Sequence, residues 1–178
     1  MNRFVIAEPN KCIGCRTCEV ACVMAHQSGE EEMTLQSFQP RLTVVRNGKV
    51  TTPILCRHCD DAPCAKACPV NAIVFSHDSV QVMQELCLGC KTCVVACPYG
   101  AMNIVQVPAE PMPGTFVSHR MKSEAQKCDL CIGRAEGPAC VTVCPTKALH
   151  LVDRKVMAST LRKRQEQAAL DLASGAKF

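Results

Sequence analysis

Cysteine is the residue type through which this sequence can do chemistry. Sixteen of the 178 residues are cysteine, a proportion typical of chains held together by disulfides, metal ions or metal clusters. The cysteines fall into four groups of four, with none left over. In chain order the groups are Cys12, Cys15, Cys18 and Cys22; Cys56, Cys59, Cys64 and Cys68; Cys87, Cys90, Cys93 and Cys97; and Cys128, Cys131, Cys140 and Cys144.

The spacing of the first and third groups, C-x2-C-x2-C-x3-C, is specific for [4Fe–4S] clusters. A tight C-x2-C-x2-C loop places three thiolates around one cubane cluster, and the fourth cysteine points to another cluster. Gly14 and Gly89 lie inside these loops, where the backbone must bend closely. The cysteines therefore predict four [4Fe–4S] clusters, each with three ligands from one group and one from another. The spacing leaves open which groups exchange their fourth cysteine.

Other uses of paired cysteines fit the sequence less well. Structural zinc sites also contain C-x2-C pairs, but they usually join two separated pairs. A c-type haem needs C-x-x-C-H, whereas Cys59 precedes Asp60 and Cys131 precedes Ile132. The N-terminus carries no recognisable leader, which predicts a cytoplasmic protein whose thiols stay reduced and disfavours disulfides.

The four groups form an internal repeat. Groups one and three read CIGCRTCEVAC and CLGCKTCVVAC, which are identical at eight of eleven positions. Groups two and four both have a proline shortly before the third cysteine and end in Cys-Pro, as APCAKACP and GPACVTVCP. The order A, B, A, B indicates duplication of a two-site unit.

Short strands and turns must position these loops, and the predicted fold class is α+β with ferredoxin-like units. Asn47-Gly48, within residues 42–55, is a strong hairpin signal. Residues 108–127 contain several prolines and predict an exposed connecting loop. Residues 154–173 hold no Pro, Gly or Cys and predict a terminal helix that packs on the body or on a partner. The other predicted strands are residues 3–7, 73–75 with 80–83, 102–107 and 149–152.

The charge is concentrated at one end of the chain. The formal net charge is +4, and residues 1–153 carry equal numbers of acidic and basic side chains. The excess therefore lies in residues 154–178, as a solvated helix face or a docking element. This tail lacks the interleaved aromatic residues of nucleic-acid-binding segments. No stretch approaches the roughly 20 apolar residues that a membrane span needs.

The sequence predicts no catalytic residues, so the chain is not expected to be an enzyme on its own. Its histidines have no catalytic motif around them and are expected to be surface or satisfied residues: His26, His58, His77, His119 and His150. His58 lies between Cys56 and Cys59 and is a candidate for tuning a cluster. Tyr99 is expected to pack against a cluster, and Arg16 and Lys91 are either charges that offset a cluster or solvated.

The cysteine groups and their flanks resemble a known family. The opening MNRFVIAEPNKCIGCRTCEVAC, the block CDDAPCAKACPVNAI and the segments CDLC and GPACVTVCPTKALHLVD are similar to the four-cluster iron–sulfur subunits of molybdopterin oxidoreductases. The resemblance covers residues 1 to about 153. It is closest to the small iron–sulfur subunits that accompany formate dehydrogenase H and formate hydrogenlyase.

The resemblance implies nested pairing of the groups, the first with the fourth and the second with the third. It also implies two ferredoxin-like dicluster units, one from residues 1–55 and 108–153 and one from residues 56–107, followed by the basic tail. The implied ligands are Cys12, Cys15, Cys18 and Cys144 for cluster one; Cys22, Cys128, Cys131 and Cys140 for cluster two; Cys56, Cys59, Cys64 and Cys97 for cluster three; and Cys68, Cys87, Cys90 and Cys93 for cluster four.

The function implied by the resemblance is electron transfer. Four [4Fe–4S] clusters would relay single electrons between a molybdenum or tungsten bis-molybdopterin formate dehydrogenase subunit and a hydrogenase or a further iron–sulfur subunit. Two alternatives stay open: a polyferredoxin that diffuses freely, and an assembly factor for formate dehydrogenase or hydrogenase. Self-association through the C-terminal helix is a further expectation.

Overall fold

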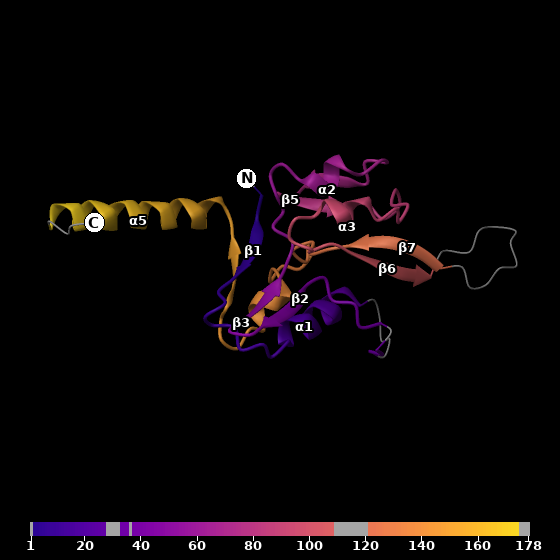
Figure 1. Cartoon of the computed structure of the whole chain (residues 1–178), viewed down its shortest axis with the longest axis horizontal. Helices are drawn as coiled ribbons and strands as arrows, with labels where there is room; N and C mark the ends of the chain where they lie inside the picture. The colour runs from indigo at the N-terminus through magenta and orange to yellow at the C-terminus, as the bar shows by residue number, and fades with distance from the viewer. Residues whose placement is uncertain (1, 28–32, 36, 109–120, 175–178) are drawn as a thin grey trace, which may run out of the picture.

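The computed structural model describes residues 2–27, 33–35, 37–108 and 121–174. Across these residues the chain forms five helices and four two-stranded antiparallel sheets (Figure 1). The sheets pair β1 (Phe4–Ala7) with β8 (Leu149–Val152), β2 (Thr43–Asn47) with β3 (Val50–Ile54), β4 (Ile73–Ser76) with β5 (Ser79–Val82), and β6 (Asn103–Pro108) with β7 (Met121–Gln126). The helices are α1 (Thr17–His26), α2 (Pro63–Lys66), α3 (Thr92–Ala96), α4 (Ala139–Thr142) and α5 (Arg154–Ala173). This mixture confirms the predicted α+β class.

The hairpin predicted at Asn47-Gly48 is present, but its turn lies one residue later. Asn47 is still paired, opposite Val50, so the two turn residues are Gly48 and Lys49. Of these two only Gly48 has a positive φ, of 51°. A two-residue turn with glycine in the first position also matches the right-handed twist of the strands. The hairpin signal was correct because it rests on glycine, which supplies the positive φ.

The loop predicted over residues 108–127 is wrong for residues 121–126, which form a strand. Met121–Gln126 forms β7 and pairs along its whole length with β6, from Pro108 opposite Met121 to Asn103 opposite Gln126. Residues 109–120 lie outside the described part of the chain. The neighbouring prolines suggested a connection, and the polar sequence MKSEAQ has little strand propensity of its own. This segment forms a strand because it pairs with β6 and because Ala125 is buried.

Two separate hydrophobic cores hold the fold together, and cysteines belong to both. One core combines Val5, Leu42, Val44, Leu55 and Leu149 with buried cysteines from the first and fourth groups. The other combines Ile73, Val80, Met102 and Ala125 with buried cysteines from the second and third groups. Helix α1 contacts α4 in the first core, and α2 contacts α3 in the second. The division into two dicluster units stays a prediction, and β7 lies with the second core.

The predicted terminal helix is present as α5, and it extends away from the rest of the chain (Figure 1). The Asp153 carboxylate caps its start by accepting a hydrogen bond from the Val156 amide at 2.8 Å. None of the residues of α5 is buried, and Leu161 and Leu170 are 51% and 64% exposed. The helix therefore does not pack on the body. Within the described residues, no helix combines the length and the apolar character that crossing a membrane requires.

Candidate iron–sulfur sites

The first and third cysteine loops share one backbone shape. In each loop a glycine has a positive φ, 71° at Gly14 and 66° at Gly89. In each, the residue before the helix is also left-handed, Arg16 with φ 60° before α1 and Lys91 with φ 69° before α3. The duplicated sequence thus folds into a duplicated loop. A helix follows each loop: the fourth cysteine of the first group, Cys22, lies within α1, and the fourth cysteine of the third group, Cys97, directly follows α3.

Both loop glycines are also pressed against a neighbouring strand. A Cβ atom on Gly14 would lie 2.7 Å from Cγ2 of Thr51 in β3, and one on Gly89 would lie 2.5 Å from Cβ of Ser123 in β7. Real Cβ atoms do not approach so closely. Glycine is needed here for its dihedral angles and for its lack of a side chain. Strand β3 therefore packs directly against the first cysteine loop, and strand β7 packs directly against the third.

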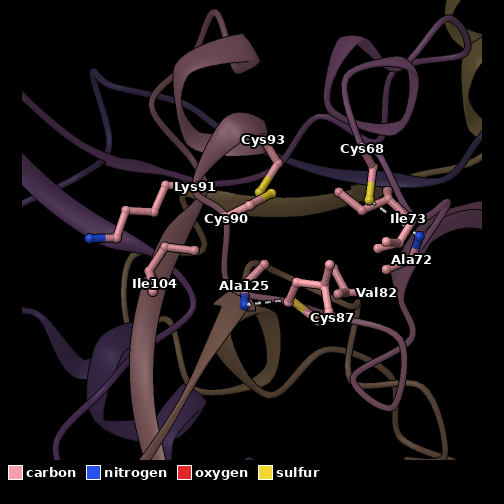
Figure 2. Close-up of a pocket in the computed structure, with 13 residues that line it drawn as sticks. Cys68, Ala72, Ile73, Val82, Cys87, Cys90, Lys91, Cys93, Ile104 and Ala125 are labelled. Atoms are coloured by element: carbon pink, nitrogen blue, oxygen red, sulfur yellow. Dashed lines mark hydrogen bonds between the residues drawn. The ribbon is translucent and has the colours of Figure 1, made fainter.

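Three cavities of nearly equal size are each lined by four cysteines. The cavities lined by the first-, second- and third-group cysteines each have a volume of about 20 Å³. Figure 2 shows the third-group cavity, with the side chain of Cys68 across from those of Cys90 and Cys93. In each cavity three cysteines come from one group and the fourth from another group. The sets are Cys12, Cys15, Cys18 and Cys144; Cys56, Cys59, Cys64 and Cys97; and Cys68, Cys87, Cys90 and Cys93.

The remaining four cysteines also come together. Cys22, Cys128 and Cys140 are buried in the same core, where α1 contacts α4. Burial raises the pKa of the Cys140 thiol, and the neighbouring sulfur atoms of Cys128, Cys131 and Cys22 raise it further. We call the four sets site one (with Cys12), site two (with Cys128), site three (with Cys56) and site four (with Cys87). The sets coincide with those that the resemblance implied, and ligation by them stays a prediction.

Backbone amides donate hydrogen bonds to the sulfur atoms, and the pattern is repeated. The Ala72 amide lies 3.2 Å from Cys68 Sγ, and the Ala148 amide lies 3.2 Å from Cys144 Sγ, four residues on in both cases. The Ala125 amide in β7 lies 3.4 Å from Cys87 Sγ (Figure 2). Amide donors to thiolate sulfur stabilise negative charge and tune the potential of a cluster. The chain therefore holds and polarises these sulfur atoms.

Burial makes these thiols hard to ionise by themselves. It raises the pKa of Cys18 and of Cys64 to about 11, and that of Cys128 to about 12. Several thiolates gathered away from water need a compensating positive charge, which bound iron supplies as protons leave. All-thiol donor sets, three of which surround cavities of one size, fit [4Fe–4S] clusters.

Four other side chains that the sequence singled out lie around the sites. Arg16 and Lys91 line the cavities of sites one and four, and Figure 2 shows the Lys91 ammonium turned away from the sulfur atoms. Tyr99 lines the site-three cavity and is half exposed, with the Arg57 guanidinium 5.9 Å from its ring centre. His58 is 1% exposed, and its Nδ1 accepts a hydrogen bond from the Val80 amide at 3.1 Å. Burial, followed by the charge of Lys127, lowers the pKa of His58 to about 3, so it is neutral.

A charged network beside site two was not anticipated. Asp129 Oδ1 lies 2.9 Å from His26 Nε2, and Asp129 Oδ2 lies 2.7 Å from Arg41 Nη1. Nδ1 of His26 lies 2.7 Å from the Cys22 carbonyl oxygen. Burial opposes charge on His26, yet the hydrogen bonds to Asp129 and Cys22 together outweigh it and raise the pKa of His26 to about 10. Nothing in the sequence around His26 or Arg41 indicates this, because Asp129 lies about 100 residues away from each.

Lys127 is a second feature that the sequence reasoning missed. It is 3% exposed and lines the site-three cavity, directly before Cys128 of site two. Its Nζ donates hydrogen bonds to the carbonyl oxygens of Val80 and, at 2.9 Å, of Cys128. The only signal in the sequence is the adjacency to Cys128, and adjacency does not reveal burial.

Comparison with known proteins agrees with the geometry. The 4Fe-4S dicluster domain family matches residues 49–154, and a 4Fe-4S binding domain family matches residues 9–25. The chain is 50% identical to the electron transport protein HydN of Escherichia coli strain K12 over 96% of this chain and 99% of HydN. It is 44% identical to formate hydrogenlyase subunit 2 of the same strain over 93% of this chain and 89% of that subunit. It is also 44% identical to the putative oxidoreductase AegA, over 95% of this chain but 25% of AegA. The chain therefore belongs to the 4Fe-4S dicluster domain family of iron–sulfur proteins.

Proposed function

We propose that this protein is an electron-transfer subunit that holds four [4Fe–4S] clusters in sites one to four. The observation that carries the proposal is the lining of three equal cavities by four cysteines each, three from one group and one from its nested partner. Its similarity to HydN and to formate hydrogenlyase subunit 2 supports the same conclusion. When bound, each cluster accepts and gives up one electron without any bond to the substrate of a partner.

The chain's own contribution is to place the sites in a linear order. Helix α1 carries Cys18 of site one and Cys22 of site two, so these sites are neighbours. Lys127 lines site three beside Cys128 of site two. Helix α2 begins at Pro63, carries Cys64 of site three and ends at Lys66, two residues before Cys68 of site four. The order one, two, three, four follows, with sites one and four at the ends.

Both ends of this order reach the surface. Cys15 of site one and Cys90 of site four are exposed. Ile13 and Leu88, which line the cavities of these sites, are 63% and 69% exposed. Exposed apolar side chains over a redox site suit contact with a partner protein. Electrons therefore enter at one end and leave at the other.

The proposed partners follow from the relatives. We place a molybdenum or tungsten bis-molybdopterin formate dehydrogenase subunit at one end, and a hydrogenase or a further iron–sulfur subunit at the other, within the cytoplasm. Formate hydrogenlyase subunit 2 is the relative that supports this choice. The exposed helix α5 is available for self-association or for docking to such a partner.

Anaerobic reconstitution tests this function. The purified protein is mixed with a formate dehydrogenase catalytic subunit and formate, and its visible absorbance and EPR spectrum are followed. Reduction of its clusters only when both components are present, followed by oxidation on adding hydrogenase, is the expected result. Stable association without any cluster reduction would instead indicate an assembly factor. Equal reduction of the clusters without complex formation would indicate a freely diffusing carrier.

A further inference from the structure

Lys127 is a buried cation among the sites, and no carboxylate neutralises it. Its side chain is 3% exposed, whereas lysine is almost never fully buried unless it is paired. Among the described residues, its hydrogen-bond partners are two carbonyl oxygens, and no ion pair includes it. The nearby carboxylate of Asp129 is engaged by Arg41 and His26. The compensating negative charge must come from another group.

The position of Lys127 indicates what that group is. One of its hydrogen bonds goes to Val80 in β5, which lines the site-three cavity together with Lys127 itself. The other goes to the carbonyl of Cys128, a cysteine of site two. An ammonium group has three N–H donors, so one remains for the cavity. A [4Fe–4S] cluster with four thiolate ligands carries a net negative charge, and such a charge would neutralise the buried ammonium group of Lys127.

The same charge therefore lies beside two sites, because Lys127 lines the site-three cavity and is bonded to the backbone of Cys128 in site two. Charges interact more strongly in the protein interior than in water, and salt screens them less.

We propose that Lys127 is a positioning residue that raises the reduction potentials of the two inner sites, two and three, and thereby favours an electron in the middle of the relay. Reduction adds one electron to a cluster that is already negative, and a fixed positive charge beside the cluster lowers the cost of that addition. No bond forms or breaks, and the electron comes from the donor at one end of the relay. The inference rests on the proposed function, because it requires clusters in sites two and three.

Three variants of the full chain separate charge from shape. Lys127→Gln removes the charge but keeps N–H donors for the carbonyl oxygens, whereas Lys127→Arg keeps the charge. Lys66→Gln is the matched control. Lys66 lies in α2 between Cys64 and Cys68, but it is 68% exposed, so water screens its charge.

The measurement is an anaerobic redox titration with dithionite followed by EPR, at low and at high salt, together with iron content. The signal of site three is assigned by its loss in Cys64→Ser. In Lys127→Gln the equilibrium constant for reducing that cluster is expected to fall at least tenfold. This corresponds to a fall of at least about 59 mV in its midpoint potential for one electron. The fall should persist at high salt. Lys127→Arg and Lys66→Gln should both stay near the wild-type potential.

Several outcomes would overturn the inference. Wild-type potentials in an iron-replete Lys127→Gln protein would do so, and so would an equal fall in Lys127→Arg. If Lys127→Gln loses iron, Lys127→Arg decides: retained iron with wild-type potentials supports the role of charge, and lost iron shows that the site needs the shape of lysine. A wild-type protein without reducible cluster signals would instead refute the proposed function.

Discussion

Gly89 and Ser123 approach so closely that no side chain fits between them. A Cβ atom on Gly89 would lie 2.5 Å from both Cβ and the carbonyl oxygen of Ser123. The loop that carries Cys87, Cys90 and Cys93 is therefore pressed against β7, the strand that also supplies the amide donor to Cys87 Sγ. Site four depends on a strand that begins at Met121, 28 residues after Cys93.

Gly89→Ala is expected to disrupt site four selectively. The left-handed φ alone costs about 1–2 kcal/mol for alanine, and the clash with Ser123 pushes the loop off β7. Iron content should fall by about a quarter, since one of four proposed cubanes is lost. Gly48→Ala is the control, because Gly48 also has a positive φ but has no atom within 4 Å of the added Cβ. Equal iron loss in both variants would show that packing against β7 is unimportant.

Nested pairing predicts which cysteine variants affect the same cluster. Cys22→Ser and Cys140→Ser should alter one EPR signal, that of site two, and Cys18→Ser should alter a different one. The reason is that Cys18 lines the site-one cavity with Cys144, whereas Cys22 does not line it and packs in one core with Cys128 and Cys140. Should Cys22→Ser instead alter the signal lost in Cys64→Ser, the first group would be paired with the second.

Asp129→Asn is expected to destabilise the protein by about 1–3 kcal/mol. It removes the acceptor shared by His26 and Arg41 and leaves two partly buried donors without their charged partner. The midpoint of anaerobic urea unfolding, followed by cluster absorbance, measures the effect. Asp61→Asn breaks the exposed ion pair with Lys66 and should change stability by less than about 0.5 kcal/mol. Similar midpoints for the two variants would contradict a stabilising role for the network.

Leu161→Ser and Leu170→Ser in α5 should leave iron content and the unfolding midpoint unchanged. Both side chains are at least half exposed and no residue of α5 is buried, so the substitutions remove no packing within the chain. Sedimentation velocity of the same variants measures self-association. A lowered midpoint would mean that α5 packs on the body in solution.

The sequence predicts the three cysteines that one loop contributes to a site. It does not predict the contacts between distant segments that complete the site. The spacing of Cys12, Cys15 and Cys18 is set within one loop, so the sequence alone indicates three ligands of one cluster. The approach of Cys144 to that loop depends on the pairing of β1 with β8 and on the contact of α1 with α4. Strand β7 was missed because its stability comes from β6 and from Ala125 in the core. Burial of Lys127 depends on β5, which no neighbour in sequence reveals.

Native mass spectrometry of the anaerobically purified holoprotein tests the central claim most directly. The intact chain should exceed its apoprotein mass by four [4Fe–4S] units, or about 16 iron atoms per chain. Each single-cysteine variant of a given set should lose or convert the same one unit. A fully loaded chain that carries zinc, or that holds only two clusters, would contradict the account of a four-site electron relay.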